Sequence, residues 1–502
     1  MKNKTNTYIA VLAAGKGTRM KSEYPKVLHP ICGKPMIQHV FETINALNTK
    51  KIFTIIGHQK EILLKALPKQ VIPIIQNKQL GTGHAVNQLS GYFKKENGVK
   101  HCHSEQNAVI PSGSEESKIS PFGRNDNCCE QRNKKLLGKN ACLMVLCADI
   151  PFVSERTLKS LLRQHQNAHA LATVLTCRLK NPTGYGRIVK ENGKIKKIVE
   201  ELDASPDEKT IDEINTGIYC FETNALFSAL KNVQTNNKKK EYYLTDVIEI
   251  LYSKGLQTSS FFITNEDEIR GINTKIDLAW AENHKRKEIL NRFMLSGITI
   301  IDPGTTFISE NTKIGTDTVI YPFSVIEGEN IIGKNCSLGP QTKIKNCKIG
   351  NENKIFFSVV SESILKDKTI IGPFTHIRPQ TVIDNEARLG SFVEVKKSFI
   401  GKKTKVGHLS YLGDGIIGNE VNVGAGTITC NYDGIKKYQT IIEDDAFIGS
   451  NSQLVAPVKI GKGALIGAGS TITKNVPAHA LALSRVQQTN IEGGAKRKLK
   501  NK

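Results

Sequence analysis

Over the first 300 residues, short apolar runs alternate with longer amphipathic stretches. The runs at 9–13, 52–56 and 143–147 have the length and composition of buried strands, whereas the apolar spacing at 36–47 indicates a helix. Strands that alternate with helices are typical of a mostly parallel sheet covered by helices. An α/β fold is therefore predicted for this part of the chain.

A connecting helix is predicted next. Residues 274–296 contain neither Gly nor Pro, and an apolar stripe runs through them. The stripe is formed by Ile276, Ala279, Trp280, Ile289, Leu290, Phe293 and Met294.

Beyond residue 300 the hydrophobic period changes to six. Aliphatic residues recur at Ile314, Ile320, Ile326, Ile332, Leu338 and Ile344, at Ile400, Val406 and Leu412, and at Ile448, Leu454, Ile460, Ile466 and Ile472. A period of six matches neither a helix nor an ordinary strand and is typical of a parallel β-helix of hexapeptide repeats. Each fully buried aliphatic side chain contributes about 1.5–3 kcal/mol, so the repeated set predicts a stable prism.

Residues 94–140 interrupt the α/β pattern. They are polar and rich in Pro, Ser, Gly, Asn, Lys and Glu, and predict a long surface insertion. The segment contains His101, Cys102, His103, Cys128 and Cys129, whose spacing matches no standard zinc pattern, so no metal site is predicted there.

The composition of the 502 residues narrows the class of protein. With 39% hydrophobic and 23% charged residues, the chain is globular and has room for two to four domains. It has no apolar run of about 18 residues, so no membrane contact is expected. The apolar start leads directly into Lys16 and Arg19, which indicates a first strand rather than a leader and a cytoplasmic protein. Eleven cysteines without a C-x-x-C pair predict reduced thiols.

The net charge of +23 suggests an anionic partner. The lysines are dispersed, with dense runs only at 238–240 and 496–502. A positive field that attracts small anionic substrates therefore explains the charge better than a nucleic-acid partner does. Nucleic-acid binding stays as an alternative, and the salt dependence of DNA binding tests it.

A glycine-rich loop follows the first strand, with the sequence LAAGKGTRM at 12–20. Small residues allow the backbone to approach a phosphate, and Lys16 and Arg19 supply positive charge. The segment 25–28 adds Lys26. The loop is neither a Walker motif nor G-x-G-x-x-G, and a turn with solvated charges is the alternative interpretation.

This loop, together with PKVLH at 25–29, resembles the sugar-1-phosphate nucleotidyltransferases. QLGTGHA at 79–85, PTGYGRI at 182–188, EINTG at 213–217 and GIN at 271–273 narrow the match. With its hexapeptide domain, the chain is similar to the bacterial bifunctional UDP-N-acetylglucosamine pyrophosphorylases and glucosamine-1-phosphate N-acetyltransferases over about residues 7–490, minus the insertion.

The resemblance implies a division of the chain. It places a Rossmann-like nucleotidyltransferase domain at 1–274, a linker helix at 275–296, and a left-handed β-helix N-acetyltransferase domain at 297–502. It also implies homotrimers with acetyl sites between subunits. The implied enzyme acetylates glucosamine-1-phosphate with acetyl-CoA and then couples the product to UTP with release of pyrophosphate, for cell-wall biogenesis.

The resemblance also implies roles for residues of the first domain. Asp149 and Asn273 would hold one Mg²⁺, Arg19 and Lys26 would stabilise phosphates, and Gln76 would read the uracil. Contacts with UTP or UDP-N-acetylglucosamine are implied for Leu12, Ala13, Ala14, Gly15, Lys26, Gln76, Gly81, Thr82, Cys147, Ala148, Asp149, Gly186, Glu200, Asn215 and Asn273. Ala148 stands where the family usually has Gly, and its methyl group is expected to crowd the nucleotide.

Polar residues interrupt the hexads of the second domain, as functional residues often do. His408 is the natural general base for acetyl transfer, because imidazole titrates near neutral pH; a structural histidine is the alternative. By resemblance, Arg378, Lys396, Tyr411, Asn422 and Asn431 bind glucosamine-1-phosphate or orient its amine, and Ala425, Asn431, Tyr432, Ser450, Ala468 and Arg485 line the acetyl-CoA site. Cys430 is interpreted as a wall residue rather than an acyl carrier.

Two other functions fit parts of this pattern. The β-helix of a monofunctional nucleotidyltransferase could serve only for regulation or oligomerisation, and assembly factors of translation initiation combine both folds without catalysis. The presence of Lys26, Asp149 and His408 favours the two-reaction enzyme.

Overall fold

The computed structural model describes residues 6–96 and 141–493 of the chain. The chain divides into two compact units, Met1–Ala281 and Glu282–Lys502, which are considered separately. Most of the predicted insertion, with its His and Cys residues, and the basic run at 496–502 lie outside the described residues. No helix in the described part of the chain is long and apolar enough to cross a membrane.

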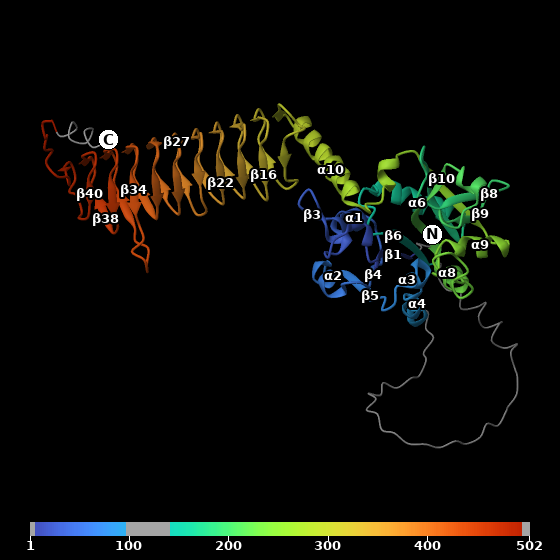
Figure 1. The fold of residues 1–502 in the computed structure, drawn as a ribbon. Coiled ribbons are helices and arrows are strands. Elements are labelled where there is room, and N and C mark those ends of the chain that lie inside the picture. The colour runs from blue at the N-terminus through green and yellow to red at the C-terminus, as the bar shows by residue number, and fades with distance from the viewer. Residues whose placement is uncertain (1–5, 97–140, 494–502) are drawn as a thin grey trace, which may run out of the picture. The chain divides into compact units, whose positions relative to one another are not determined.

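The first unit is built on one mixed sheet (Figure 1). Its strands run in the order β11 (Thr258–Ile263), β7 (Ala172–Arg178), β10 (Glu213–Glu222), β6 (Ala141–Cys147), β1 (Asn6–Ala13), β4 (Lys51–Ile56) and β5 (Val71–Ile75). Neighbouring strands are parallel except β10, which is antiparallel to β6 and β7. A hairpin of β8 (Arg187–Glu191) and β9 (Lys194–Val199) pairs with β10.

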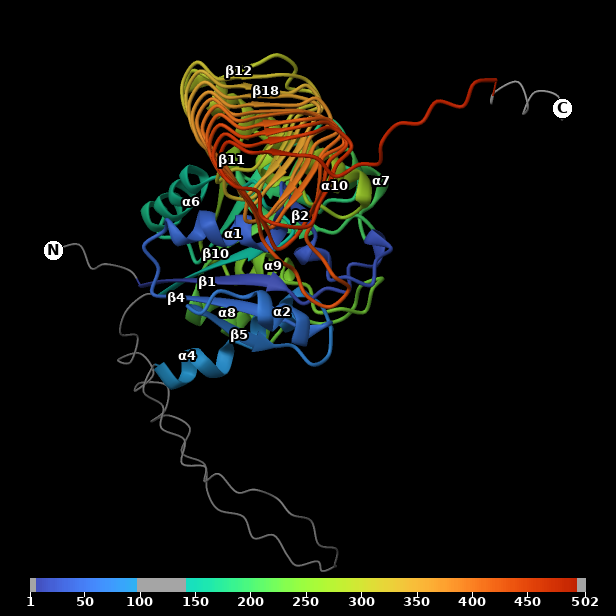
Figure 2. The same cartoon turned by 90° about the vertical axis from the view of Figure 1, so that its left-hand side faces the viewer.

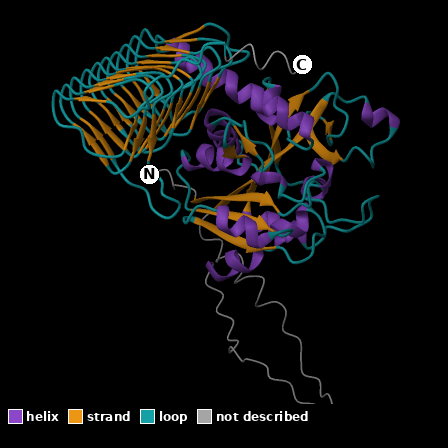
Figure 3. Ribbon diagram, turned by 60° about the vertical axis from the view of Figure 1, so that its left-hand side comes forward, coloured by secondary structure: helices purple, strands orange, loops and turns teal. Residues whose placement is uncertain are grey.

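Helices cover both faces of this sheet (Figure 3). One core cluster includes residues of α1 (Met36–Asn45), α2 (Lys60–Ala66) and α6 (Glu155–Asn167). The other includes residues of α3 (Thr82–Asn87), α4 (Ser90–Glu96), α8 (Thr223–Leu230) and α9 (Asp246–Ser253). A short helix, α7 (Pro206–Lys209), precedes β10.

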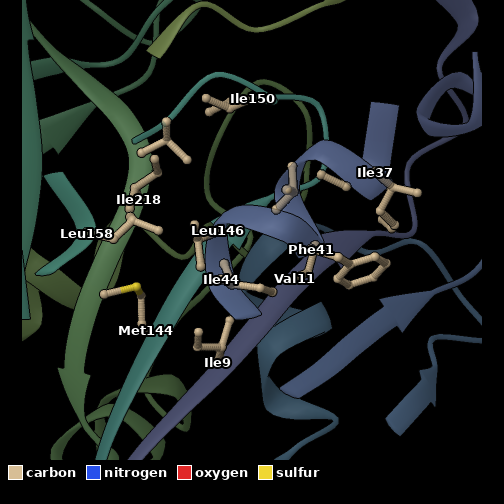
Figure 4. Close-up of a cluster of buried hydrophobic side chains, with 14 of the residues drawn as sticks. Ile9, Val11, Ile37, Phe41, Ile44, Met144, Leu146, Ile150, Leu158 and Ile218 are labelled. Atoms are coloured by element: carbon tan, nitrogen blue, oxygen red, sulfur yellow. The ribbon is translucent and has the colours of Figure 1, made fainter. Parts of the chain in front are cut away.

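Successive side chains of β1 point to opposite faces of the sheet. Because both faces are buried, the sequence of β1 is almost continuously apolar. Ile9 and Val11 point into the first cluster, where they meet Phe41 of α1 and Met144 of β6 (Figure 4). Tyr8 and Ala10 belong to the second cluster. A strand that is buried on both faces carries no polar period, as is typical of parallel sheets between helix layers.

Helix α10 (Lys275–Leu295) follows. Ile289, Leu290 and Phe293 of its predicted apolar stripe are buried. Ile276 is 81% exposed, so the predicted stripe is wrong at the amino-terminal end of the helix. The first turns pack instead through Ala281, with Leu278 and Trp280 beside it, against Ile31, Met36 and Ile272.

The second unit is a left-handed parallel β-helix: the hexads predicted the parallel coils, and the resemblance implied their hand. Its described strands form three parallel sheets of eleven, ten and nine strands, from β12 (Thr299–Ile300) to β41 (Leu481–Ala482). Each coil adds one strand to each sheet, so Ile320 lies beside Leu338, three hexads further on. Figure 2 shows the coils stacked on one another. The stacked aliphatic residues, such as Ile355, Leu389 and Ile400, are fully buried.

Glycine follows many of the buried aliphatic residues because successive coils approach closely there. A Cβ atom on Gly315 would lie 2.6 Å from the backbone nitrogen of Lys334, and one on Gly449 would lie 2.5 Å from that of Ala468. A methyl group at either position would push two coils apart. The hexad glycines thus maintain the spacing between coils.

Candidate active sites

A cavity of about 560 Å³ opens at the carboxyl ends of β1 and β6 in the first unit. Parallel strands bring their carboxyl ends to the same edge, which is where α/β sheets bind ligands. Of the sequence-predicted residues, those that line the cavity are Leu12, Ala13, Ala14, Gly15, Arg19, Lys26, Gln76, Gly81, Thr82, Cys147, Asp149 and Asn273. The fold therefore gathers residues from both ends of the unit around one space.

The shape of the glycine-rich loop depends on Gly17. Its φ of 61° lies in the left-handed region, which glycine adopts without strain. A Cβ atom at this position would lie 2.6 Å from Cβ of Lys26. The missing side chain allows Lys26 to pack against the loop and to extend into the cavity.

The ammonium group of Lys26 lies between two oxygen atoms. It donates to Oδ2 of Asp149 at 2.5 Å and to Oδ1 of Asn273 at 2.7 Å, and Nη2 of Arg19 also donates to Asn273 Oδ1 at 2.7 Å. The carbonyl of Asp149 accepts from the backbone N–H of Ile272 at 2.8 Å, which holds the two segments together. The arrangement concentrates two cations and a carboxylate at one end of the cavity.

Asp149 and Asn273 fit the predicted metal by their donor chemistry. The side-chain oxygens of both residues contact the same atom, Nζ of Lys26, so they lie close enough to share one ion. Carboxylate and amide oxygens are the ligands that Mg²⁺ prefers. Mg²⁺ usually takes one or two protein ligands and completes its shell with water and phosphate oxygens. Among the described residues, no group of three or more His, Cys, Asp or Glu side chains could hold a metal.

Gln76 is nearly buried, with 3% of its surface exposed. Its Nε2 donates to the carbonyl of Gly81 at 3.2 Å and lies 2.9 Å from Nδ1 of His84. Because these contacts engage the amide nitrogen, Oε1 is the atom that Gln76 can offer as an acceptor. Nearby, Oγ1 of Thr82 accepts from the backbone N–H of Leu244 at 3.1 Å, which anchors the cavity wall.

Ala148 does not line the cavity. It is fully buried in the first core cluster, and its N–H donates to the carbonyl of Leu12 at 3.0 Å. The expectation that its methyl group crowds the nucleotide is wrong, because the side chain packs into the core instead.

Gly186, Glu200 and Asn215 lie outside the cavity lining and gather near Tyr219. The N–H of Asn215 donates to the carbonyl of Gly186 at 2.8 Å, and Nδ2 of Asn215 donates to Oη of Tyr219 at 2.7 Å. Burial and then the charge of Glu200 raise the pKa of Tyr219 well above its usual value. Burial likewise raises the pKa of Glu200.

Several cavity residues were missed by sequence reasoning. Gln79 lies within a quoted motif and could have been found there, whereas His58 and Glu241 lie in none. Only the fold brings these two to the cavity.

In the second unit, four predicted residues occupy the same place in successive coils. His408, Ala425, Ser450 and Ala468 each precede a corner residue, and backbone hydrogen bonds at these corners, such as Asn451 N–H to the Ala425 carbonyl at 2.6 Å, stack the coils in this order. His408 ends β30 (Lys405–His408), and its side chain is exposed. Nη1 of Arg485 donates to the carbonyl of Ala468 at 2.9 Å, which adds Arg485 to the same row.

Tyr411 and Asn431 converge at Gly413. A Cβ atom on Gly413 would lie 2.4 Å from Oη of Tyr411 and 2.7 Å from Nδ2 of Asn431, so glycine leaves space for both. The three residues belong to β31 (Tyr411–Gly413) and to the segment that follows β34 (Ile428–Cys430). Asn431 is buried, and its Nδ2 donates to Oδ2 of Asp414 at 2.6 Å.

A cationic cluster lies at the same end of β31, where Lys396 pairs with Gly413. Arg378 and Lys396 are neighbours on adjacent coils, and Nη1 of Arg378 pairs with Glu394 at 2.7 Å. The ammonium of Lys437, and next the charge of Arg378, lower the pKa of Lys396. Crowded cations of this kind attract a phosphate group.

Lys437 was missed by sequence reasoning. It lies in the segment 431–439, which projects from the prism beside β34 and interrupts the hexads (Figure 1). The interruption was the signal available in the sequence.

The other predicted residues of this unit are less closely connected. Asn422 begins β33 (Asn422–Val423) and is partly exposed, and Tyr432 is 59% exposed in the projecting segment. Burial raises the pKa of the Cys430 thiol, which therefore stays protonated near neutral pH.

Comparisons with known proteins cover both units. The family model of the MobA-like NTP transferase domain matches residues 9–190, and that of the nucleotidyl transferases matches residues 121–281. The model of the bacterial transferase hexapeptide, with six repeats, matches residues 439–474.

Curated relatives match almost the whole chain. A protein of Halalkalibacterium halodurans named bifunctional protein GlmU is 45% identical over 489 residues, which cover 97% of this chain and 98% of the relative. Proteins of the same name from a Geobacillus species and from Carboxydothermus hydrogenoformans are 46% and 44% identical, over 97% and 96% of this chain and 96% and 98% of the relatives.

Proposed function

The chain belongs to the family of bifunctional GlmU proteins, and from this premise we propose that its two units catalyse two consecutive reactions of UDP-N-acetylglucosamine synthesis. The family predicted from the motifs is confirmed, and so is the combination of nucleotidyltransferase and hexapeptide transferase domains. The second unit acetylates glucosamine-1-phosphate, and the first joins the product to the uridylyl group of UTP.

Uridylyl transfer is supported by the convergence of Lys26, Asp149 and Asn273 on one point of the first cavity. In this reaction a phosphate oxygen of the sugar attacks the α-phosphorus of UTP, and pyrophosphate leaves. Lys26 and Arg19 neutralise the charge of the phosphates, and Gln76 orients the base. A Mg²⁺ ion held by Asp149 and Asn273 supplies further positive charge when it is bound. Positioning and charge neutralisation are sufficient for such a transfer.

Acetyl transfer is supported by two features at opposite ends of β31: the exposed His408 three residues before the strand, and the cationic cluster where it ends. Lys396, Arg378 and Lys437 hold the sugar phosphate, and His408 takes a proton from the amine as it attacks the thioester carbonyl of acetyl-CoA. In this proposal the backbone N–H of Ser450, in the row that begins at His408, donates to the oxyanion. The row of Ala425, Ser450, Ala468 and Arg485 provides the surface for the coenzyme.

A homotrimer with acetyl sites between subunits is part of the proposal. One corner of the prism carries large exposed apolar side chains: Phe323 is 58% exposed, Phe374 55%, Phe392 60% and Leu409 61%. The rings of Phe374 and Phe392 stack at 5.2 Å. The apolar part of this corner from Phe374 to Leu409 favours a protein partner, and it ends at the residue after His408. A second copy of the chain along this part of the corner would border the acetyl site.

The compartment and the partners follow from the same chemistry. Free cysteines in the described part of the chain, such as Cys147 and Cys430, suit a reducing cytoplasm. The partners of the proposed enzyme are UTP, glucosamine-1-phosphate and acetyl-CoA, and no nucleic acid is required.

One experiment tests the proposal directly. Purified protein is incubated with glucosamine-1-phosphate, acetyl-CoA, UTP and Mg²⁺, and the products are identified by mass spectrometry. UDP-N-acetylglucosamine, pyrophosphate and free CoA are expected. A protein that uses only N-acetylglucosamine-1-phosphate and UTP would instead be the monofunctional alternative.

A further inference from the structure

Asp414 is a buried carboxylate with no role in the proposed reaction. It occupies a corner of the β-helix with φ of 50°, directly after β31, and is 8% exposed. Its backbone N–H donates to the carbonyl of Lys396 at 3.1 Å. Asp414 thus lies beneath the cationic cluster and next to the strand that carries Tyr411.

The side chain of Asp414 has two partners. Oδ2 accepts from Nδ2 of Asn431 at 2.6 Å, and Oδ1 lies 3.4 Å from Nζ of Lys397. Lys397 is exposed, so this ion pair contributes little, whereas the bond to Asn431 is buried and charge-assisted. Asn431 is therefore the partner that Asp414 constrains.

The bond to Asp414 determines which end of the Asn431 amide faces the site. An ionised carboxylate accepts hydrogen bonds and cannot donate, so it selects the NH₂ group of Asn431. The amide oxygen, Oδ1, is then directed away from Asp414 and is available as an acceptor. A ligand group that meets this oxygen must be a donor, and the amine of an amino sugar is one.

We propose that Asp414 is a positioning residue that holds Asn431 with its amide oxygen toward the amine of the sugar phosphate. The proposal rests on the acetyl transfer proposed above. It assigns to Asn431 the recognition of the amine, a choice that the sequence left open between the sugar phosphate and the coenzyme.

The test replaces the carboxylate without changing its shape. In Asp414→Asn, the new amide can donate, so it no longer selects one orientation of Asn431. We expect kcat/KM for glucosamine-1-phosphate to fall about 10- to 100-fold, since a buried charge-assisted bond is lost. The KM for acetyl-CoA and the rate of uridylyl transfer are expected to stay unchanged.

Asp445 provides a matched control. It also occupies a corner, with φ of 62°, and its Oδ2 lies 3.6 Å from Nζ of Lys462. Asp445→Asn therefore removes a corner carboxylate that also faces a lysine, but one that is exposed and lies outside the proposed site. Its acetyl transfer is expected to equal that of the parent protein.

A sugar phosphate that lacks the amine distinguishes a positioning role of Asp414 from a general structural role. Asp414→Asn should weaken the binding of glucosamine-1-phosphate but leave that of 2-deoxyglucose-1-phosphate, measured as competitive inhibition, unchanged. Equal weakening of both ligands, or of neither, would overturn the proposal.

A double variant tests the polarity argument. Asn431→Asp combined with Asp414→Asn restores one bond with the donor and acceptor exchanged, and position 431 still presents an oxygen to the amine. Recovery of kcat/KM toward the parent value supports the proposal, and a double variant as slow as Asp414→Asn contradicts it. If the parent protein itself fails to acetylate glucosamine-1-phosphate, the proposed function fails instead.

Discussion

The two candidate sites are built in opposite ways. The first collects residues from loops far apart in the sequence, since Lys26 contacts both Asp149 and Asn273. The second is assembled from equivalent places on successive coils, as the row from His408 to Ala468 shows. The first site forms only when distant loops of the sequence come together in the fold. In the second site, the repeating coils present side chains at fixed intervals. Substitutions should therefore affect the two sites separately.

The largest effect is expected for His408→Ala. Loss of the proposed base should reduce acetyl transfer by about 10²–10⁴-fold, because no other group takes the proton of the amine. Uridylyl transfer should be unaffected. Both rates are measured on the same preparation by release of CoA and of pyrophosphate. Loss of both activities in folded protein would contradict two independent sites.

Asp149→Ala is expected to reduce uridylyl transfer and to leave acetyl transfer unaffected. It removes the carboxylate that the Lys26 ammonium contacts, and with it a proposed metal ligand. We expect a loss of about 10²–10³-fold in pyrophosphate release, the size seen when one electrostatic stabiliser is removed. Acetyl transfer is the internal control and should stay at the parent rate.

Gly17→Ala tests how the first site depends on its loop. Any side chain at φ of 61° costs about 1–2 kcal/mol, and here it also displaces Lys26. A shift of that kind is expected to slow uridylyl transfer about 10- to 100-fold. Gly33→Ala is the matched control, since Gly33 has φ of 80° but nothing within 4 Å of an added Cβ. Gly17→Ala should lose at least as much thermal stability as Gly33→Ala, and only Gly17→Ala should lose activity.

Lys437→Ala tests the residue that the sequence did not reveal. Loss of one cation from the cluster should raise the KM for glucosamine-1-phosphate by about tenfold. Because the charge of Lys437 lowers the pKa of Lys396, that pKa should rise in the variant, which NMR titration can follow. The neighbouring substitution Lys436→Ala should change neither quantity.

The smallest effect is expected for Cys430→Ala. The thiol is protonated and no acyl transfer through it is proposed, so acetyl transfer should remain close to the parent rate. Complete loss of acetyl transfer with an intact fold would show that Cys430 takes part in the reaction.

The sequence by itself determined the two kinds of architecture, because each leaves a period in the chain. Hexads specify a coil by burying one aliphatic residue per strand, and doubly buried strands such as β1 are apolar throughout. The motifs also carried most of the cavity residues, since a loop that approaches phosphate needs small residues and cations within a short stretch.

Only the tertiary structure decided where side chains point and which distant groups meet. It turned the methyl group of Ala148 into the core, brought Lys437 to Lys396, and set Asp414 against Asn431. Neither the packing of Ala148 nor the meeting of Lys437 and Lys396 leaves a period in the chain. The hexads do place Asp414 and Asn431 on adjacent coils, but they do not determine which atoms of the two side chains meet. The orientation of one amide, set by one carboxylate on the preceding coil, is a property of packing alone.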